Sequence, residues 1–516
     1  MFVRYVRLDS GAHKPENPPQ GRSPAFNMMR MLVALSASAV LAACSVARPP
    51  TDLAVDMPER WAAAPLPHQG STEALGDWWA RFDDPVLSDW IARAQRNSPD
   101  IASARAQVFS ARATLAGAEA QGRPQADAVA IASRGITDTA TPLGTTLSAG
   151  LQASWAVDLW GGNSARVGSA RAQQDAAGAR WHEARVLVAA EVAQLYFGQR
   201  LCREQLGVAL RDRDSRQVTA ESNAVTERAG LTAPAVAALA RASAAESVAR
   251  WRTQQAQCER QLKSIAALTA QPEADVRRQL DGAPDLNAWL ASGRVDRLLQ
   301  VSAVPAEVLR QRPDVYRAQR ELVAASEDVG VARAALRPGL TLQGSVLRNR
   351  FSGGGLEFTA NSWSIGPITL SLPLLGRDAL RASADSAQAR YEAAASAYAA
   401  TLRQAVAEVE QSLVTLTSLS ERLAATEAAQ AGYNRSLEAT EARYRVGFAN
   451  LNELEEARRL KLNADSSAVA LQQERLNAWL DLYVALGGGF DPVTTADALN
   501  TDDANNASNN VANQPR

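Results

Sequence analysis

The feature that most constrains this chain is an internal duplication of half the sequence. Residues 97–100 (NSPD) recur 214 residues later as 311–314 (QRPD), and residues 228–230 (RAG) recur 217 residues later as 445–447 (RVG). Three further landmarks keep the same order: Arg123-Pro124 with Arg337-Pro338, 159–162 with 374–377, and 191–193 with 408–410. The period is far longer than a solenoid repeat, so we expect two similar half-proteins in one chain.

Each half is predicted to run helix, strand, strand, long helix, sharp turn, helix. In the first half the opening helix spans about Ser98–Gly122, a less regular strand covers Gln125–Arg134, and Leu147–Asp158 alternates apolar with polar residues. In the second half the strands are expected at Leu340–Val346 and Trp363–Leu372. Each strand is about ten residues, the length that a tilted strand needs to cross a bilayer.

Four strands cannot close into a barrel, and an open sheet edge is not tolerated in lipid, where no water satisfies the backbone. If these strands cross a membrane, several copies of the chain must share one barrel. Two, three or four copies give 8, 12 or 16 strands, and only the larger barrels leave a wide lumen.

The predicted helices are long. Asn163–Glu227 contains no proline and would extend roughly 100 Å at the helical rise. The return helix, Thr232–Thr269, is shorter, but placed end to end with Ser98–Gly122 it would cover roughly 95 Å. In the second half, apolar residues at heptad spacing predict a coiled-coil seam with Ser420 as its one polar member. Ordinary helix-bundle packing is the alternative. The apolar members of the seam are Leu402, Val406, Val409, Leu413, Leu416 and Leu423.

The N-terminus predicts that the protein is exported and anchored to the outer membrane by lipid. Residues 1–27 look like a mis-assigned start, and residues 28–43 have one charged residue followed by an apolar stretch of signal-peptide length. The sequence Leu41-Ala42-Ala43-Cys44 is typical of a bacterial lipobox, so we expect lipidation at Cys44. The alternative is an ordinary secretory signal followed by an incidental cysteine.

Composition excludes several function classes. The 54 Lys and Arg balance 55 Asp and Glu, so the basic surface of a nucleic-acid binder is absent. Three His and three Cys leave little material for a metal centre, and no catalytic constellation or phosphate loop is found. We expect neither enzyme activity nor a cofactor or metal.

Taken in order, these features resemble the TolC-like outer-membrane factors, in the subgroup of NodT- and OprM-type efflux lipoproteins. The resemblance covers about residues 44–490 and rests on residues 78–85 (WWARFDDP), 155–161 (WAVDLWG) and 309–315 (LRQRPDV), together with the lipobox and the duplication. It implies a mainly α protein with transmembrane β-strands: a homotrimer with a shared 12-stranded β-barrel in the outer membrane and a periplasmic α-barrel of helical hairpins.

The same resemblance implies a passive exit duct for a tripartite efflux pump that exports drugs or other small toxic compounds. Its partners would be a periplasmic adaptor, an inner-membrane transporter of the resistance–nodulation–division class, and outer-membrane lipids. The expected organisation is an N-terminal equatorial segment at 44–96, repeat 1 at 97–285, a linker at 286–310, repeat 2 at 311–490 and a disordered tail at 491–516.

The two sharp turns are the expected hairpin tips. Glycine supplies the left-handed conformation that ends a helix, and arginine lies near the negative end of the helix dipole. A plain connector is the simpler reading, but the resemblance implies that these turns dock the adaptor; the tip residues are Arg228, Gly230, Leu231, Arg445, Gly447 and Phe448.

Just beyond the second tip, Glu453 and Glu456 share one helix face. By resemblance, acidic residues at these positions ring the closed periplasmic entrance and Tyr444 helps to hold it shut, although glutamate replaces the family's usual aspartate. The alternative is a solvated helix face on which Glu455 pairs with Arg459.

Cys202 and Cys258 lie 28 residues before and after Gly230, so an antiparallel hairpin brings them to one height. Because the periplasm favours disulfides, we predict a bond between them. Two small buried residues on faces that miss each other remain the alternative.

Two other functions stay open at this stage. The same architecture would serve a type I protein secretion system. A lipid-anchored periplasmic coiled-coil scaffold would explain the lipobox and the helices, but not the four alternating strands.

Overall fold

A computed structural model describes residues 45–53, 55, 61–62, 78–79, 82–136, 143–291, 309 and 312–491. The predicted leader, the signal peptide, the lipidation site Cys44, most of the linker and the tail beyond Asp491 therefore lie outside the described residues.

The first half of the chain has two helices, two strands, a long helical hairpin and two short helices, in that order. Its helices are α2 (Pro85–Asn97), α3 (Pro99–Gln121), α4 (Gly162–Arg228), α5 (Pro234–Thr269), α6 (Glu273–Asp281) and α7 (Leu286–Ala291), with strands β1 (Gln125–Gly135) and β2 (Gly144–Val157) between α3 and α4. A proline in the first turn begins α2, α3 and α5, as expected where the backbone N–H has no partner within the helix.

The second half repeats the order of helix, two strands, long helix and returning helix. Its elements are α9 (Pro313–Ala334), β3 (Gly339–Gly353), β4 (Leu356–Ser371), α10 (Arg377–Arg445) and α11 (Leu451–Ala485). The backbone repeats as well, because Gly161 before α4 and Gly376 before α10 both take the left-handed conformation, at φ 76° and 74°.

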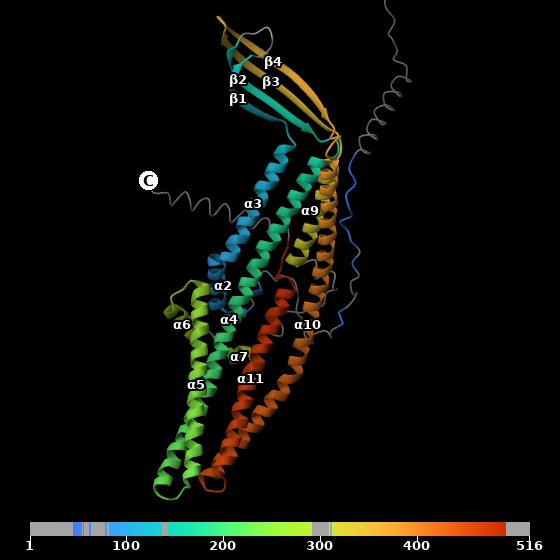
Figure 1. Ribbon diagram of the computed structural model, residues 1–516. Helices are drawn as coiled ribbons and strands as arrows, with labels where there is room; N and C mark the ends of the chain where they lie inside the picture. The colour runs from blue at the N-terminus through green and yellow to red at the C-terminus, as the bar shows by residue number, and fades with distance from the viewer. Residues whose placement is uncertain are drawn as a thin grey trace, which may run out of the picture.

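The molecule is elongated, with the sheet at one end and two helical tips at the other (Figure 1). The long helices α4 and α10 run from the sheet to the tips; α3 and α5 lie along successive parts of α4, and α9 and α11 along successive parts of α10. In both halves, two shorter helices placed end to end therefore run along one long helix, as the lengths predicted for the first half.

The strands form one antiparallel sheet in the order β1-β2-β3-β4, and the central β2–β3 pair joins the two halves. The predicted length of about ten residues is right for β1, which has 11, and too short for β2, β3 and β4, which have 14, 15 and 16. Strand β3 continues to Gly353, beyond the predicted end at Val346, because backbone pairing needs no apolar side chains. Strand β4 begins at Leu356, well before the predicted Trp363, and residues 356–361 alternate apolar with polar side chains in the opposite phase to Trp363 and Ile365. Gly354 and Gly355, both at positive φ, make the two-residue turn between these strands.

The sheet has one apolar and one polar face, because residues opposite each other in an antiparallel pair point to the same side. Leu151 lies opposite Val346, which lies opposite Trp363, and all three are exposed. Gln152 lies opposite Ser345, which lies opposite Ser364 on the other side. We call these sides the apolar face (Leu147, Leu151, Val346, Trp363, Ile365, Ile368) and the polar face (Gln125, Gln152, Ser154, Ser345, Asn349, Ser364).

The main hydrophobic core lies midway between the sheet and the tips. Trp78 stacks on Tyr483 with ring centroids 4.3 Å apart, and Trp90 packs edge-on against Tyr196. The predicted heptad seam enters this core with one correction: Leu419, not Ser420, is the buried member after Leu416. The Ser420 hydroxyl is exposed and donates to the carbonyl of Thr417 on its own helix, because the apolar stripe continues by a step of three residues instead of four.

Among the described residues, every helix is too short or too polar to act as a membrane span.

Candidate functional site

The two hairpin tips have the same backbone construction. The N–H of Leu231 donates to the carbonyl of Thr226 at 2.9 Å, and the N–H of Phe448 donates to the carbonyl of Arg443 at 2.8 Å. In each tip the residue before the donor is a glycine in the left-handed conformation, Gly230 at φ 73° and Gly447 at φ 82°. This is the Schellman ending, which needs a residue tolerant of positive φ.

Apolar side chains project from both tips into solvent. Leu231 is 79% exposed and its counterpart Phe448 is 77% exposed. Arg228 and Arg445 are exposed in the last turns of α4 and α10, where cations are favourable near the helix C-terminus. The predicted tip residues therefore form two similar exposed surfaces, each with one large apolar side chain and one arginine.

Glu453 and Glu456 lie in the first turns of α11, and both have cationic neighbours. Asn450 caps the helix by accepting from the N–H of Glu453, whose carboxylate lies 3.5 Å from the guanidinium of Arg443. Arg459 pairs with Glu456 at 2.6 Å, and its hydrogen bonds hold the pKa of the Glu456 carboxyl below its usual value. The expected acidic face is therefore partly neutralised within the chain.

Tyr444 joins the two hairpins near the tips. Its hydroxyl accepts from the side-chain amide of Asn223 at 2.9 Å, and Asn223 is buried on α4 while Tyr444 is on α10. The Tyr444 ring packs against a small apolar cluster that includes Leu451 and Leu454 of α11.

A buried ion cluster, for which the sequence gives no direct signal, lies between this apolar cluster and the main hydrophobic core. It comprises Asp212 and Arg216 of α4 and Glu455 and Arg458 of α11. The Arg216 side chain is only 7% exposed; it bonds Asp212 at 2.8 Å and also pairs with Glu455. Arg458 lies 3.1 Å from Glu455.

The cluster reaches the other two helices of the hairpins. Arg216 donates to Ser243 of α5 at 2.5 Å, and Arg458 lies 3.7 Å from Glu441 of α10. The expected pairing of Glu455 with Arg459 is wrong, because Glu455 faces inward while Arg459 pairs with Glu456 on the exposed side. The i, i+4 spacing of Asp212 and Arg216 was visible in the sequence, but nothing there paired them with α11.

Cys202 of α4 and Cys258 of α5 are joined by a disulfide in the structure, with their Cα atoms 5.6 Å apart. The amide of Gln254 lies 3.2 Å from the Cys202 sulfur. The bond links the two helices of the first hairpin at the height given by their equal distance from Gly230.

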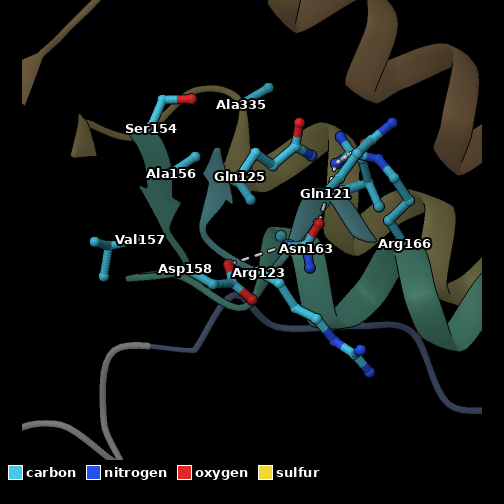
Figure 2. Close-up of a pocket in the computed structure, with 13 residues that line it drawn as sticks. Gln121, Arg123, Gln125, Ser154, Ala156, Val157, Asp158, Asn163, Arg166 and Ala335 are labelled. Atoms are coloured by element: carbon cyan, nitrogen blue, oxygen red, sulfur yellow. Dashed lines mark hydrogen bonds between the residues drawn. The ribbon is translucent and has the colours of Figure 1, made fainter. Parts of the chain in front are cut away.

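A pocket of about 500 Å³, with both polar and apolar lining residues, lies where the sheet meets the helices (Figure 2). The carboxylate of Asp158 caps the start of α4 by accepting from the N–H groups of Asn163 at 3.0 Å and Ser164 at 2.8 Å. Arg166 donates to Gln121 at 3.2 Å, which ties α4 to the end of α3. These hydrogen bonds hold the junction between the sheet and the helices in place, and no sequence motif marks the residues that make them.

Within the described part of the chain, no group of three or more His, Cys, Asp and Glu side chains is placed to hold a metal ion.

Comparison with known proteins gives a consistent result. The sequence pattern of the family described as outer membrane efflux protein matches residues 90–271 and 304–488, that is, both halves. The pyoverdine export outer membrane protein OpmQ of Pseudomonas aeruginosa is 30% identical over 478 residues, covering 90% of this chain and 97% of the relative. The outer membrane protein OprJ of the same organism is 28% identical, covering 91% and 97%.

Among solved structures, the outer-membrane channel OprN superposes with a TM-score of 0.73 at 26% identity, covering 86% of this chain and 98% of that one.

Proposed function

Since the chain belongs to the outer membrane efflux protein family, we propose that three copies of it form one duct through the outer membrane and across the periplasm. The protein is an outer-membrane efflux channel and works in a pump with a periplasmic adaptor and an inner-membrane transporter. A transporter of the resistance–nodulation–division class is the proposed energy source.

The sheet is the observation that carries this proposal. Its apolar face is exposed, its polar face presents amides and hydroxyls, and β1 and β4 are edge strands. Twelve strands from three copies would pair these edges, turn the apolar faces to lipid and line a wide lumen with the polar faces. The anchored-scaffold alternative gives such a sheet no role.

At the other end we propose that the tips dock the adaptor and that residues near them close the duct. The exposed Leu231 and Phe448 would bind apolar grooves of the partner. Glu453 and Glu456 would lie near the threefold axis, where six carboxylates would favour cations. We also propose that lipid on Cys44 adds a second membrane anchor to the barrel.

The cargo is proposed to be drugs or other small toxic compounds. The name of OpmQ ties that relative to pyoverdine export, so pyoverdine belongs among the compounds whose export by this chain is tested. A duct for type I protein secretion is the alternative, distinguished by loss of one secreted protein instead of sensitivity to many compounds.

Three measurements test the proposal. The purified protein should run as a heat-sensitive oligomer in detergent and should conduct ions in planar bilayers. Deleting its gene should increase sensitivity to several compounds in a broad panel of toxic compounds, and complementation should restore resistance. A monomer in detergent without conductance would overturn the channel assignment.

A further inference from the structure

Arginines gather at one end of the apolar face of the sheet. The β2–β3 register places Arg348 opposite Ala149 and Arg350 opposite Leu147, so both guanidiniums project on the apolar side. Arg134 of β1 is paired with Thr145 on that same side. All three lie in the half of the sheet farthest from the helices, beyond Leu151, and all three are exposed.

A pocket of about 460 Å³ lies beneath two of these arginines. Its floor is made of small and apolar side chains, Ala130, Ala132, Ala149 and Leu147, and Arg348 and Arg350 form one wall. Alanines on β1 and β2 leave room that larger side chains would fill, so the surface is hollow beside the guanidiniums. The small apolar side chains suit contact with an acyl chain, and the two guanidiniums suit a phosphate group.

The charges at this end do not cancel. Arg350 pairs with Glu357 of β4. Among the described residues no ion pair is found for Arg134 or Arg348, which leaves two positive charges in excess of the one acidic partner. Arginine suits phosphate because its planar guanidinium donates two parallel hydrogen bonds.

The position along the sheet points to the membrane interface. Between the arginines and the helical end of the sheet, the apolar face carries Val346, Trp363 and Ile365. The Ile365 side chain is 91% exposed. A lipid-facing arginine is costly at the middle of the bilayer and nearly neutral at its surface. The helices mark the periplasmic end, so the arginine end lies at the outer leaflet (Figure 1).

We propose that Arg134, Arg348 and Arg350 form a binding site for a phosphate-bearing lipid of the outer leaflet, with its acyl chains against the alanine floor of the pocket. This inference rests on the proposed function, because it needs the apolar face to be turned toward lipid. The three arginines would hold the phosphates of one or two neighbouring lipids against each copy of the chain.

The test uses the full chain in detergent, with lipid A as the probe and its dephosphorylated form as the comparison, each added at equal concentration and detected by native mass spectrometry. The wild type should retain lipid A about tenfold better than the dephosphorylated form, a factor that corresponds to about 1.4 kcal/mol. The double variant R348Q/R350Q should abolish that preference. A matched control, R381Q/R435Q, removes two exposed arginines of α10 outside the sheet and should keep it.

Equal retention of both lipids by the wild type, or an unchanged preference in R348Q/R350Q, would overturn the site. Planar-bilayer conductance of the same variant separates this failure from a failure of the channel itself. A variant that conducts but has lost the lipid preference supports both proposals; a conducting wild type without any preference removes only the lipid site.

Discussion

The side-chain amide of Asn223 donates to the hydroxyl of Tyr444 at 2.9 Å, and this single bond links the long helix of the first hairpin to the long helix of the second. The link lies between the exposed tips and the buried ion cluster, at the level where α4, α5, α10 and α11 come together.

Removing this link should loosen the tips. Tyr444→Phe deletes the acceptor and leaves the Asn223 amide with its bond to the carbonyl of Thr219 on its own helix. We expect a larger single-channel conductance, or longer open times, in planar bilayers. Tyr433→Phe removes a hydroxyl from an exposed tyrosine of the same helix and serves as the control. Identical conductance in the two variants would remove Tyr444 from the gate.

Neutralising Glu453 and Glu456 together should change the ions that pass. The double variant E453Q/E456Q removes up to six carboxylates from a trimer, so we expect a higher conductance or a weaker preference for cations, measured as a shift in reversal potential in a salt gradient. Glu474→Gln is a suitable control, because Glu474 also pairs with an exposed arginine, Arg422, but lies far along α11. If neither quantity changes, the two residues do not line the entrance.

Breaking the buried ion cluster should destabilise the protein. Arg216→Ala removes one cationic partner from the buried carboxylates of Asp212 and Glu455. Because Arg250 still pairs with Asp212 and Arg458 with Glu455, we expect a loss of about 1–3 kcal/mol. The thermal transition in detergent should fall accordingly. Arg241→Ala breaks an exposed pair with Glu227 nearer the tip and should cost less than about 1 kcal/mol. Equal losses in the two variants would argue against a structural role for the cluster.

The disulfide should be present in protein purified without reductant. Peptide mass spectrometry under non-reducing conditions is expected to find Cys202 and Cys258 linked, whereas free thiols at both positions would rule the bond out. Replacing both with alanine should lower stability by about 2–4 kcal/mol, because the bond closes a loop of 56 residues in the unfolded chain.

Acid should weaken the fold through His182. Burial, assisted by the nearby charge of Arg185, lowers the pKa of this imidazole to about 4. The unfolded chain therefore takes up the proton first, so the stability held above pH 6.5 is lost as the pH falls from about 6.5 to about 4. Thermal transitions measured across this range should fall by less in His182→Gln than in the wild type. Parallel curves would contradict the assignment.

Much of the fold follows from local signals in the sequence. Pro99 and Pro234 begin helices, Gly230 and Gly447 end them, and the predicted bounds of the three helices α3, α4 and α5 in the first half are right within about two residues. The strands are right in place, but β2, β3 and β4 are longer than predicted, because backbone pairing continues where the apolar alternation stops or changes phase.

The contacts between helices are less accessible to prediction. Glu455 and Glu456 are neighbours in the sequence, yet a rotation of about 100° per residue puts one in the buried ion cluster and the other on the exposed face. The same step separates Leu419 from Ser420. Only the position of the facing helix decides between such neighbours, and that position depends on packing over the whole hairpin.

The pairing of Val157 with Leu340 affects how the protein is made. The chain is synthesised and exported from its N-terminus, so β1 and β2 emerge while their partner β3 is still separated from them by α4, α5 and everything between. During that interval β2 has an unsatisfied backbone edge beside an apolar surface, which is the combination most prone to aggregate. We therefore expect the edge of β2 in a nascent copy to need protection from other chains until its second half has arrived.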